Sequence, residues 1–64
     1  MELYSKEQLT KIVTSIAIFQ ELQTATEYIV RNAVAIIKNY GATFYNSIAY
    51  TLQEQTRKLE KITL

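Results

Sequence analysis

The fold is decided by residues 38–62, KNYGATFYNSIAYTLQEQTRKLEKI, which combine the chain's one glycine with its most regular hydrophobic spacing. A cation at Lys38 followed by Gly41 is a common end of an α-helix, because glycine adopts left-handed backbone angles without strain. The core positions that follow are spaced three and four residues apart: Tyr45, Ile48, Leu52, Gln55, Leu59 and Ile62. This spacing is typical of a coiled coil. We therefore predict a turn at residues 40–43 and a helix over about residues 44–62.

The upstream half of the chain carries a second helical signal, which begins at Ser5. Ser5 is followed three residues later by Gln8, a capping-box pattern in which the two side chains satisfy free backbone N–H groups at a helix start. From Leu9 to Tyr40, hydrophobic residues recur at steps of three and four, as on one side of a helix. We therefore predict a long helix over about residues 6–39.

A break in this long helix is an open alternative. The apolar side rotates between the two halves of the helix by about twice the drift that a heptad repeat explains. This rotation indicates a kink or a break near residues 20–26, where Thr24 followed by Glu27 would supply a new capping box. Nothing in the stretch forces a break, so a continuous helix and a broken one both remain possible.

The short connection at Gly41 makes its flanking helices antiparallel neighbours. The expected fold is all-α: an antiparallel helical hairpin, or a short three-helix unit if the first helix breaks, with coiled-coil-like packing in one domain over residues 1–64. A chain of 64 residues buries only about 60% of its unfolded surface, so its own core is marginal. Without cysteine or histidine it has neither a disulfide nor a zinc site to compensate. We expect oligomerisation to complete the core.

Two sets of hydrophobic residues are the candidate interfaces. We expect the residues of the apolar stripes to form the contacts within the hairpin and between chains: Leu9, Ile12, Ile16, Phe19, Ile29, Val30, Ile36, Ile37, Ile48, Leu52, Leu59 and Ile62. Large residues outside those stripes form a possible second interface: Ile18, Leu22 and Tyr50. Gln55 occupies a core position, where a polar residue either fixes the register of association or lies in a solvent-open part of the seam.

The composition argues against catalysis. The chain lacks histidine, cysteine and aspartate, which removes most of the usual general bases and nucleophiles. Its six acidic residues are glutamates spread along the whole chain, and its glycine lies at the predicted turn rather than in a phosphate-binding loop. We therefore expect a protein that is not an enzyme and that binds no cofactor and no metal.

The charges disfavour nucleic acid and membranes as partners. Seven Lys and Arg residues against six glutamates give a formal net charge of +1, with the two signs interspersed. Nucleic acids and anionic lipids instead attract concentrated positive charge. No apolar run approaches the roughly 20 residues of a membrane span, and the N-terminus lacks the residue order of a signal peptide. We expect a cytoplasmic protein whose partner is another copy or another helical protein.

The expected function is therefore binding, as a self-assembling structural, scaffold or adaptor subunit. The alternative is a small dimeric DNA-binding regulator. Residues 12–19, IVTSIAIF, are rich in β-branched side chains, which are common in strands. Strand, helix, turn and helix is the element order of ribbon-helix-helix DNA-binding dimers. The resemblance extends to this order alone, and the capping box at Ser5 and the helical spacing disfavour it.

Overall fold

The computed structural model describes residues 3–63, and every secondary-structure element in this part is an α-helix. The helices are α1 (Lys6–Thr14), α2 (Phe19–Arg31), α3 (Ala33–Tyr40) and α4 (Ala42–Thr63). The all-α prediction is therefore confirmed. The hairpin and three-helix predictions are wrong in helix number, because the expected long first helix is divided into α1, α2 and α3.

The DNA-binding alternative required a strand near residues 12–19. These residues instead run from α1 through the connection at residues 15–18 into α2. The described part of the chain contains no strand, so the ribbon-helix-helix element order is wrong for this protein.

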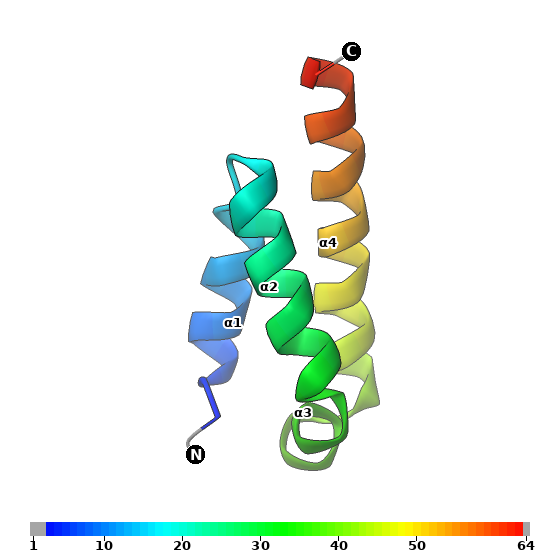
Figure 1. The fold of residues 1–64 in the computed structure, drawn as a ribbon. Helices are drawn as coiled ribbons and strands as arrows, with labels where there is room; N and C mark the ends of the chain where they lie inside the picture. Colours follow the sequence, from blue (N-terminus) through cyan, green and yellow to red (C-terminus); the bar gives the residue numbers. More distant parts are fainter. Residues whose placement is uncertain (1–2, 64) are drawn as a thin grey trace.

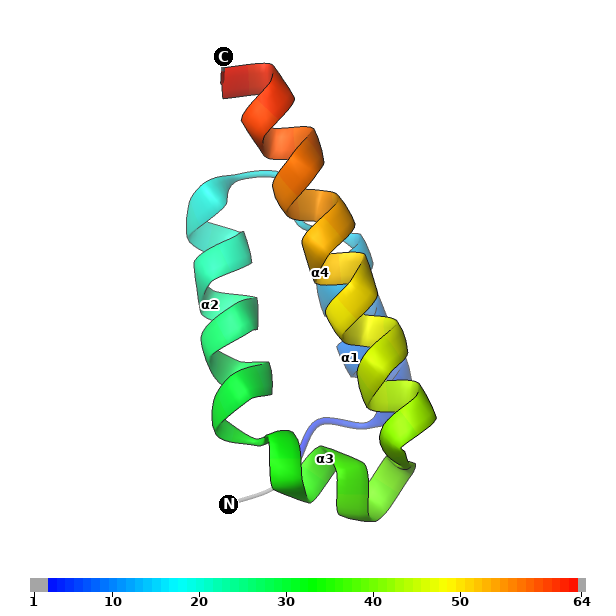
Figure 2. The ribbon, with the colours of Figure 1, turned by 90° about the vertical axis from the view of Figure 1, so that its right-hand side faces the viewer.

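Three of the helices run along the length of the molecule, and α3 closes one end (Figures 1 and 2). α1, α2 and α4 alternate in direction, while α3 crosses the base and carries the chain from α2 to α4. The described part measures 38 × 22 × 18 Å, which is a compact shape for this length. With 22 residues at 1.5 Å each, α4 is about 33 Å long. Its C-terminal end therefore projects beyond the connection between α1 and α2 (Figures 1 and 2).

The start of α1 follows the predicted capping box. The Gln8 backbone N–H donates to Ser5 Oγ at 3.2 Å, and the Ser5 backbone N–H donates to Gln8 Oε1 at 3.1 Å. Two of the N–H groups that a helix start leaves unsatisfied are thereby paired. The prediction of this helix start is confirmed.

The first break lies at residues 15–18, upstream of the predicted region at residues 20–26. Thr24, the expected cap, is instead inside α2, where its hydroxyl donates to the Gln20 carbonyl at 3.0 Å. The start of α2 has no side-chain cap at Ile18. The second capping box is therefore wrong, since α2 begins five residues before Thr24.

Side chains of α4 and α2 form hydrogen bonds with backbone groups at this break. Gln55 Nε2 of α4 donates to the Val13 carbonyl at 3.0 Å, in the last turn of α1. Glu21 Oε1 accepts from the Ala17 backbone N–H at 2.7 Å, just before α2. Because Gln55 lies 42 residues from Val13, the break depends partly on tertiary packing that a local sequence pattern does not contain.

The second break is at Asn32, between α2 and α3. Asn32 has φ −105° and ψ 17°, and its side-chain Nδ2 donates to the Tyr28 carbonyl at 2.8 Å. An asparagine side chain that bonds the preceding turn competes with the helical hydrogen bonds and bends the helix. The bend directs α3 across the base of the molecule (Figure 2).

Gly41 makes the turn into α4. Its φ of 96° is positive, as the sequence predicted, while its ψ of 154° is extended rather than left-handed helical. This combination is essentially confined to glycine. The Gly41 N–H donates to the Ile37 carbonyl at 2.9 Å, so the last turn of α3 is closed by a backbone bond before the chain reverses.

The described part of the chain builds a hydrophobic core of its own. The buried side chains come from all four helices: Leu9, Val13, Leu22, Ala25, Ile29, Ile36, Ile48, Leu52 and Leu59. α4 packs against each of the other helices. No polar or charged side chain among the described residues is buried in this core.

The contact between Gln55 and α1 gives a first prediction. Gln55→Glu removes the donor to the Val13 carbonyl and places a negative charge beside it. The Val13 carbonyl then loses its hydrogen-bond donor inside the protein. We expect the free energy of unfolding to fall by about 1–2 kcal/mol, the usual cost of an unsatisfied polar group. Urea denaturation followed by circular dichroism measures the loss.

Gln53→Glu is the matched control, because it makes the same chemical change at an exposed position of α4. Its effect should stay within about 0.5 kcal/mol. Equal effects of the two substitutions would show that the bond from Gln55 to Val13 does not stabilise the fold.

Candidate functional site

The acidic side chains of residues 3–63 are dispersed over the surface. Among the described residues, no group of three or more acidic, histidine or cysteine side chains is placed to hold a metal ion. No helix in this part of the chain is long and apolar enough to cross a membrane. The features that stand out on the surface are hydrophobic.

A groove of about 590 Å³ lies between α1 and α2. It forms because α1 and α2 both pack closely on α4 and touch each other less. Hydrophobic side chains make most of its walls: Tyr4, Leu9, Ile12, Ile16, Ile18, Ala25, Tyr28 and Ile29. Such a volume and lining are typical of sites that receive an apolar group.

Tyr4 and Tyr28 line one end of this groove, and hydrogen bonds hold Tyr4 in place there. The Tyr4 backbone N–H donates to Tyr28 Oη at 3.1 Å, and Tyr40 Oη donates to the Tyr4 carbonyl at 2.7 Å. The rings of Tyr4 and Tyr28 lie 4.8 Å apart between centroids. The segment before α1 is thus held by side chains of α2 and α3.

The upper end of the groove is open and carries a single charge. Ile18, at the connection between α1 and α2, is 53% exposed and lines the groove. Among the described residues in the lining, Glu21 is the only charged one. The groove therefore combines aliphatic walls with one carboxylate, which favours an occupant with an apolar group beside a cation.

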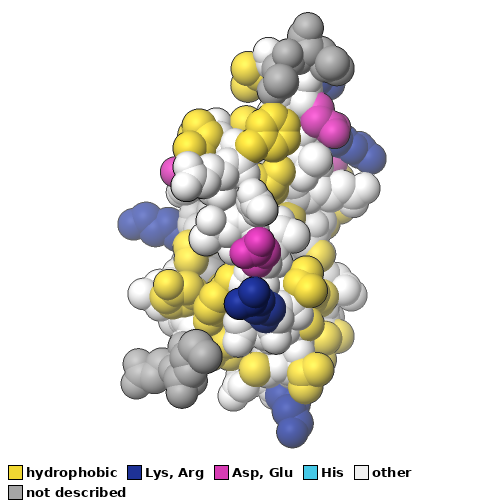
Figure 3. Space-filling view, viewed as in Figure 1, with side chains coloured by type: hydrophobic (Ala, Val, Ile, Leu, Met, Phe, Trp, Pro, Cys, Tyr) yellow, Lys and Arg dark blue, Asp and Glu magenta, His cyan; other side chains and the backbone are white. Residues whose placement is uncertain are grey.

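A second exposed apolar surface follows α2 into α3. Val30, Val34 and Ile37 are spaced four and three residues apart, and Val34 is 74% exposed. Figure 3, seen from the direction of Figure 1, shows hydrophobic side chains along both flanks of α2 and near the connection to α1. Single charged side chains separate these clusters.

The end of α4 carries the most exposed large hydrophobic side chain of the described part. Ile62 is 80% exposed, although Leu59, one turn earlier, is only 7% exposed. The hydrophobic seam of α4 therefore continues beyond the region that α1 and α2 cover.

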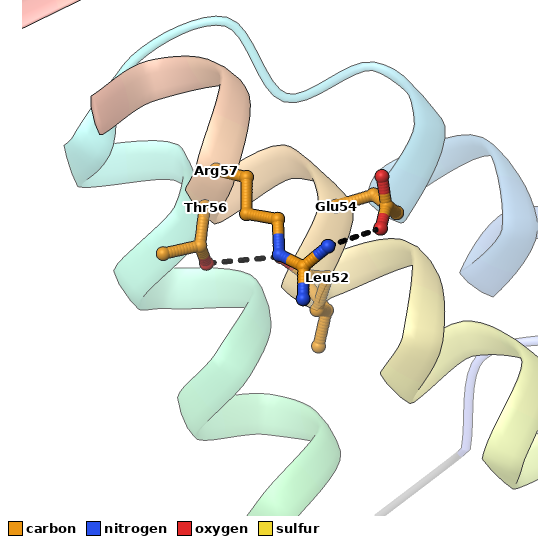
Figure 4. A network of polar contacts seen from close by, with 4 residues as sticks. All are labelled: Leu52, Glu54, Thr56 and Arg57. Atoms are coloured by element: carbon orange, nitrogen blue, oxygen red, sulfur yellow. Dashed lines mark hydrogen bonds and ion pairs between the residues drawn. The ribbon is translucent and has the colours of Figure 1, made fainter. Parts of the chain in front are cut away.

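The outer side of α4 is polar, and its ion pair is exposed to solvent. Arg57 Nη1 lies 3.5 Å from Glu54 Oε1, and the Thr56 hydroxyl donates to the Leu52 carbonyl at 2.9 Å (Figure 4). The Arg57 side chain is 64% exposed, and exposed ion pairs of this kind add little stability. Tyr50 is an exposed aromatic residue of the same helix.

The structure divides the sequence-predicted interface residues into three groups. Six lie in the chain's own core: Leu9, Ile29, Ile36, Ile48, Leu52 and Leu59. Two are half-buried against it: Ile12 and Ile16. Four are exposed: Phe19, Val30, Ile37 and Ile62.

The possible second interface is also divided. Ile18 and Tyr50 are exposed, whereas Leu22 is buried and belongs to the core. Sequence reasoning missed Val34, although its spacing from Val30 and Ile37 is helical. It also missed the groove, whose walls come from residues far apart in the chain, such as Ile12 and Tyr28.

Comparison with known proteins gives no match: no protein-family model fits the chain, and no curated protein or solved structure is significantly similar to it.

The contact between Tyr4 and Tyr28 gives a second prediction. Tyr28→Phe removes the acceptor of the Tyr4 N–H but keeps the ring. Hydrogen exchange of that amide, followed by NMR, should become about fivefold faster, because a hydrogen bond contributes on the order of 1 kcal/mol. Tyr50→Phe is the control, since Tyr50 is exposed on α4 and should not alter the exchange of Tyr4. Unchanged exchange in both variants would mean that Tyr28 does not hold this segment.

Proposed function

We propose that this protein acts without catalysis, through association of its helices with a second copy or with another helical protein. It would serve as a self-assembling structural, scaffold or adaptor subunit. The core that it forms alone leaves several large hydrophobic side chains exposed. In this proposal those side chains, with the coiled-coil-like continuation of α4, make the contacts with partners.

One observation carries the proposal: the exposed hydrophobic residues are grouped. Isolated exposed hydrophobic residues are ordinary in soluble proteins. Here Val30, Val34 and Ile37 lie close together in sequence across the junction of α2 and α3, Ile18 is adjacent to Phe19, and all five are exposed. Grouped exposed hydrophobic side chains are typical of surfaces that bind other proteins.

The distribution of charge supports a protein partner. The formal net charge is +1, and positive and negative side chains are mixed on the visible face (Figure 3). Two copies of such a chain do not repel each other strongly, and a nucleic acid gains little electrostatic attraction from it. The absence of histidine, cysteine and aspartate from the sequence supports a role other than catalysis.

The proposal predicts reversible self-association of the isolated chain. In sedimentation equilibrium, the average mass should rise above 7.4 kDa with increasing concentration. The helical circular dichroism signal should change little, because the nine buried residues belong to one chain. Sulfate should strengthen the association, as it strengthens hydrophobic contacts.

A chain that remains monomeric over the whole concentration range, with and without sulfate, would contradict self-assembly. An association that disappears at high sodium chloride would contradict the hydrophobic basis of the proposal, because exposed charge contacts are the ones that salt screens.

A further inference from the structure

We propose that the groove between α1 and α2 receives the end of α4 from a second copy of the chain. By the end of α4 we mean residues 58–62 of this helix, with Ile62 as the side chain that enters the groove. This inference rests on the self-association proposed above and names the two surfaces that would form it. One surface is an exposed hydrophobic side chain on a projecting helix, and the other is a hydrophobic groove at a different place on the molecule.

The end of α4 has a hydrophobic side chain that its own chain does not cover. Ile62 lies about one helical turn after the buried Leu59 and is 80% exposed. Its neighbours Glu60 and Lys61 are also exposed, as expected for the polar side of a helix. The end projects past the connection between α1 and α2 (Figures 1 and 2). A partner can therefore reach Ile62 without disturbing the core.

The groove has the shape and chemistry to accept such a side chain. Its volume of about 590 Å³ exceeds that of an isoleucine side chain, and Ile12, Ile16 and Ile18 are among its walls. Ile18, at the upper end of the groove, is partly exposed and can be reached from solvent. The same chain's Ile62 has no route into the groove, because α4 is one continuous helix up to Thr63 and runs past it. An occupant must therefore come from outside the chain, and the projecting end of a second copy supplies the required hydrophobic side chain.

The charges on the two surfaces are complementary. Lys58 lies one helical turn before Ile62, on the same side of α4, whereas Glu60 lies on a different side. Glu21 is the only charged residue among the described groove residues. Its Oε1 accepts from the Ala17 N–H, and a carboxylate has further acceptor positions for an ammonium group. With Ile62 in the groove, Lys58 of the same end can pair with Glu21 and fix the orientation.

The arrangement allows a closed assembly. Each copy has one projecting end and one groove, so two copies that exchange their ends satisfy both contacts by twofold symmetry. The buried Leu59 and the groove lining keep their own-chain packing in such a pair. Association therefore adds contacts to folded chains and requires no unfolding.

Two single substitutions test the two surfaces separately. Ile62→Glu removes the hydrophobic side chain and places a negative charge toward Glu21, while glutamate retains good helix propensity. Ile18→Asn removes the hydrophobic wall at the exposed end of the groove and places an uncharged polar side chain at the N-cap of α2, where asparagine is favourable for folding. Each variant should stay helical by circular dichroism and associate about tenfold or more weakly by sedimentation equilibrium.

Mixing the two variants gives the decisive measurement. The Ile18→Asn chain keeps its end, and the Ile62→Glu chain keeps its groove, so one of the two contacts is intact in a mixed pair. The mixture should therefore form a one-to-one dimer more tightly than either variant associates alone. Gln53→Glu is the matched control, because it adds a glutamate to an exposed part of α4 outside both surfaces and should associate like the unchanged chain. Val34→Glu tests the competing surface on α2 and α3.

The outcomes separate this inference from the proposed function. If the unchanged chain associates and both variants associate equally well, the contact is elsewhere and the inference is overturned, while association itself stands. Loss of association in Val34→Glu alone would overturn it in favour of the surface on α2 and α3. An unchanged chain that never associates would overturn both.

Discussion

The hydrophobic seam of α4 is the constraint on which the other three helices depend. α1, α2 and α3 are short, and each packs against α4. Isolated helices of 8 to 13 residues are marginal in water, so their stability must come from burying one side on a neighbour. α4 provides that neighbour as far as Leu59, with Ile48, Leu52 and Leu59 buried in turn.

The features predicted correctly are those encoded by neighbouring residues. The capping box joins Ser5 and Gln8 within one turn, and the positive φ of Gly41 follows from the properties of glycine itself. The predicted break was placed too late in the chain. The actual break at residues 15–18 depends in part on Gln55, which donates to the Val13 carbonyl from the other half of the sequence. The break at Asn32 was not predicted, although its cue is local: a polar residue in an apolar stretch, whose side chain donates to the Tyr28 carbonyl one turn earlier.

The hydrophobic pattern predicted which residues avoid water better than it predicted what covers them. Leu9 and Ile36 are completely buried within one chain, although the small size of the protein had suggested that partners would be needed. Helical spacing assigns a residue to a side of a helix but does not say which neighbour faces that side. The groove illustrates the limit, because it exists only where α1 and α2 diverge across α4.

Because α4 follows the other three helices in the sequence, the order of synthesis bears on how the protein forms. α1, α2 and α3 are synthesised first, before the seam that will cover Leu9 and Ile36 exists. At about 5–20 residues per second, the 22 residues of α4 take roughly one to four seconds to add. The contacts that close the fold span large separations, 36 residues from Tyr4 to Tyr40 and 42 from Val13 to Gln55. The apolar sides of α1, α2 and α3 therefore stay uncovered by α4 until α4 has been added to the chain.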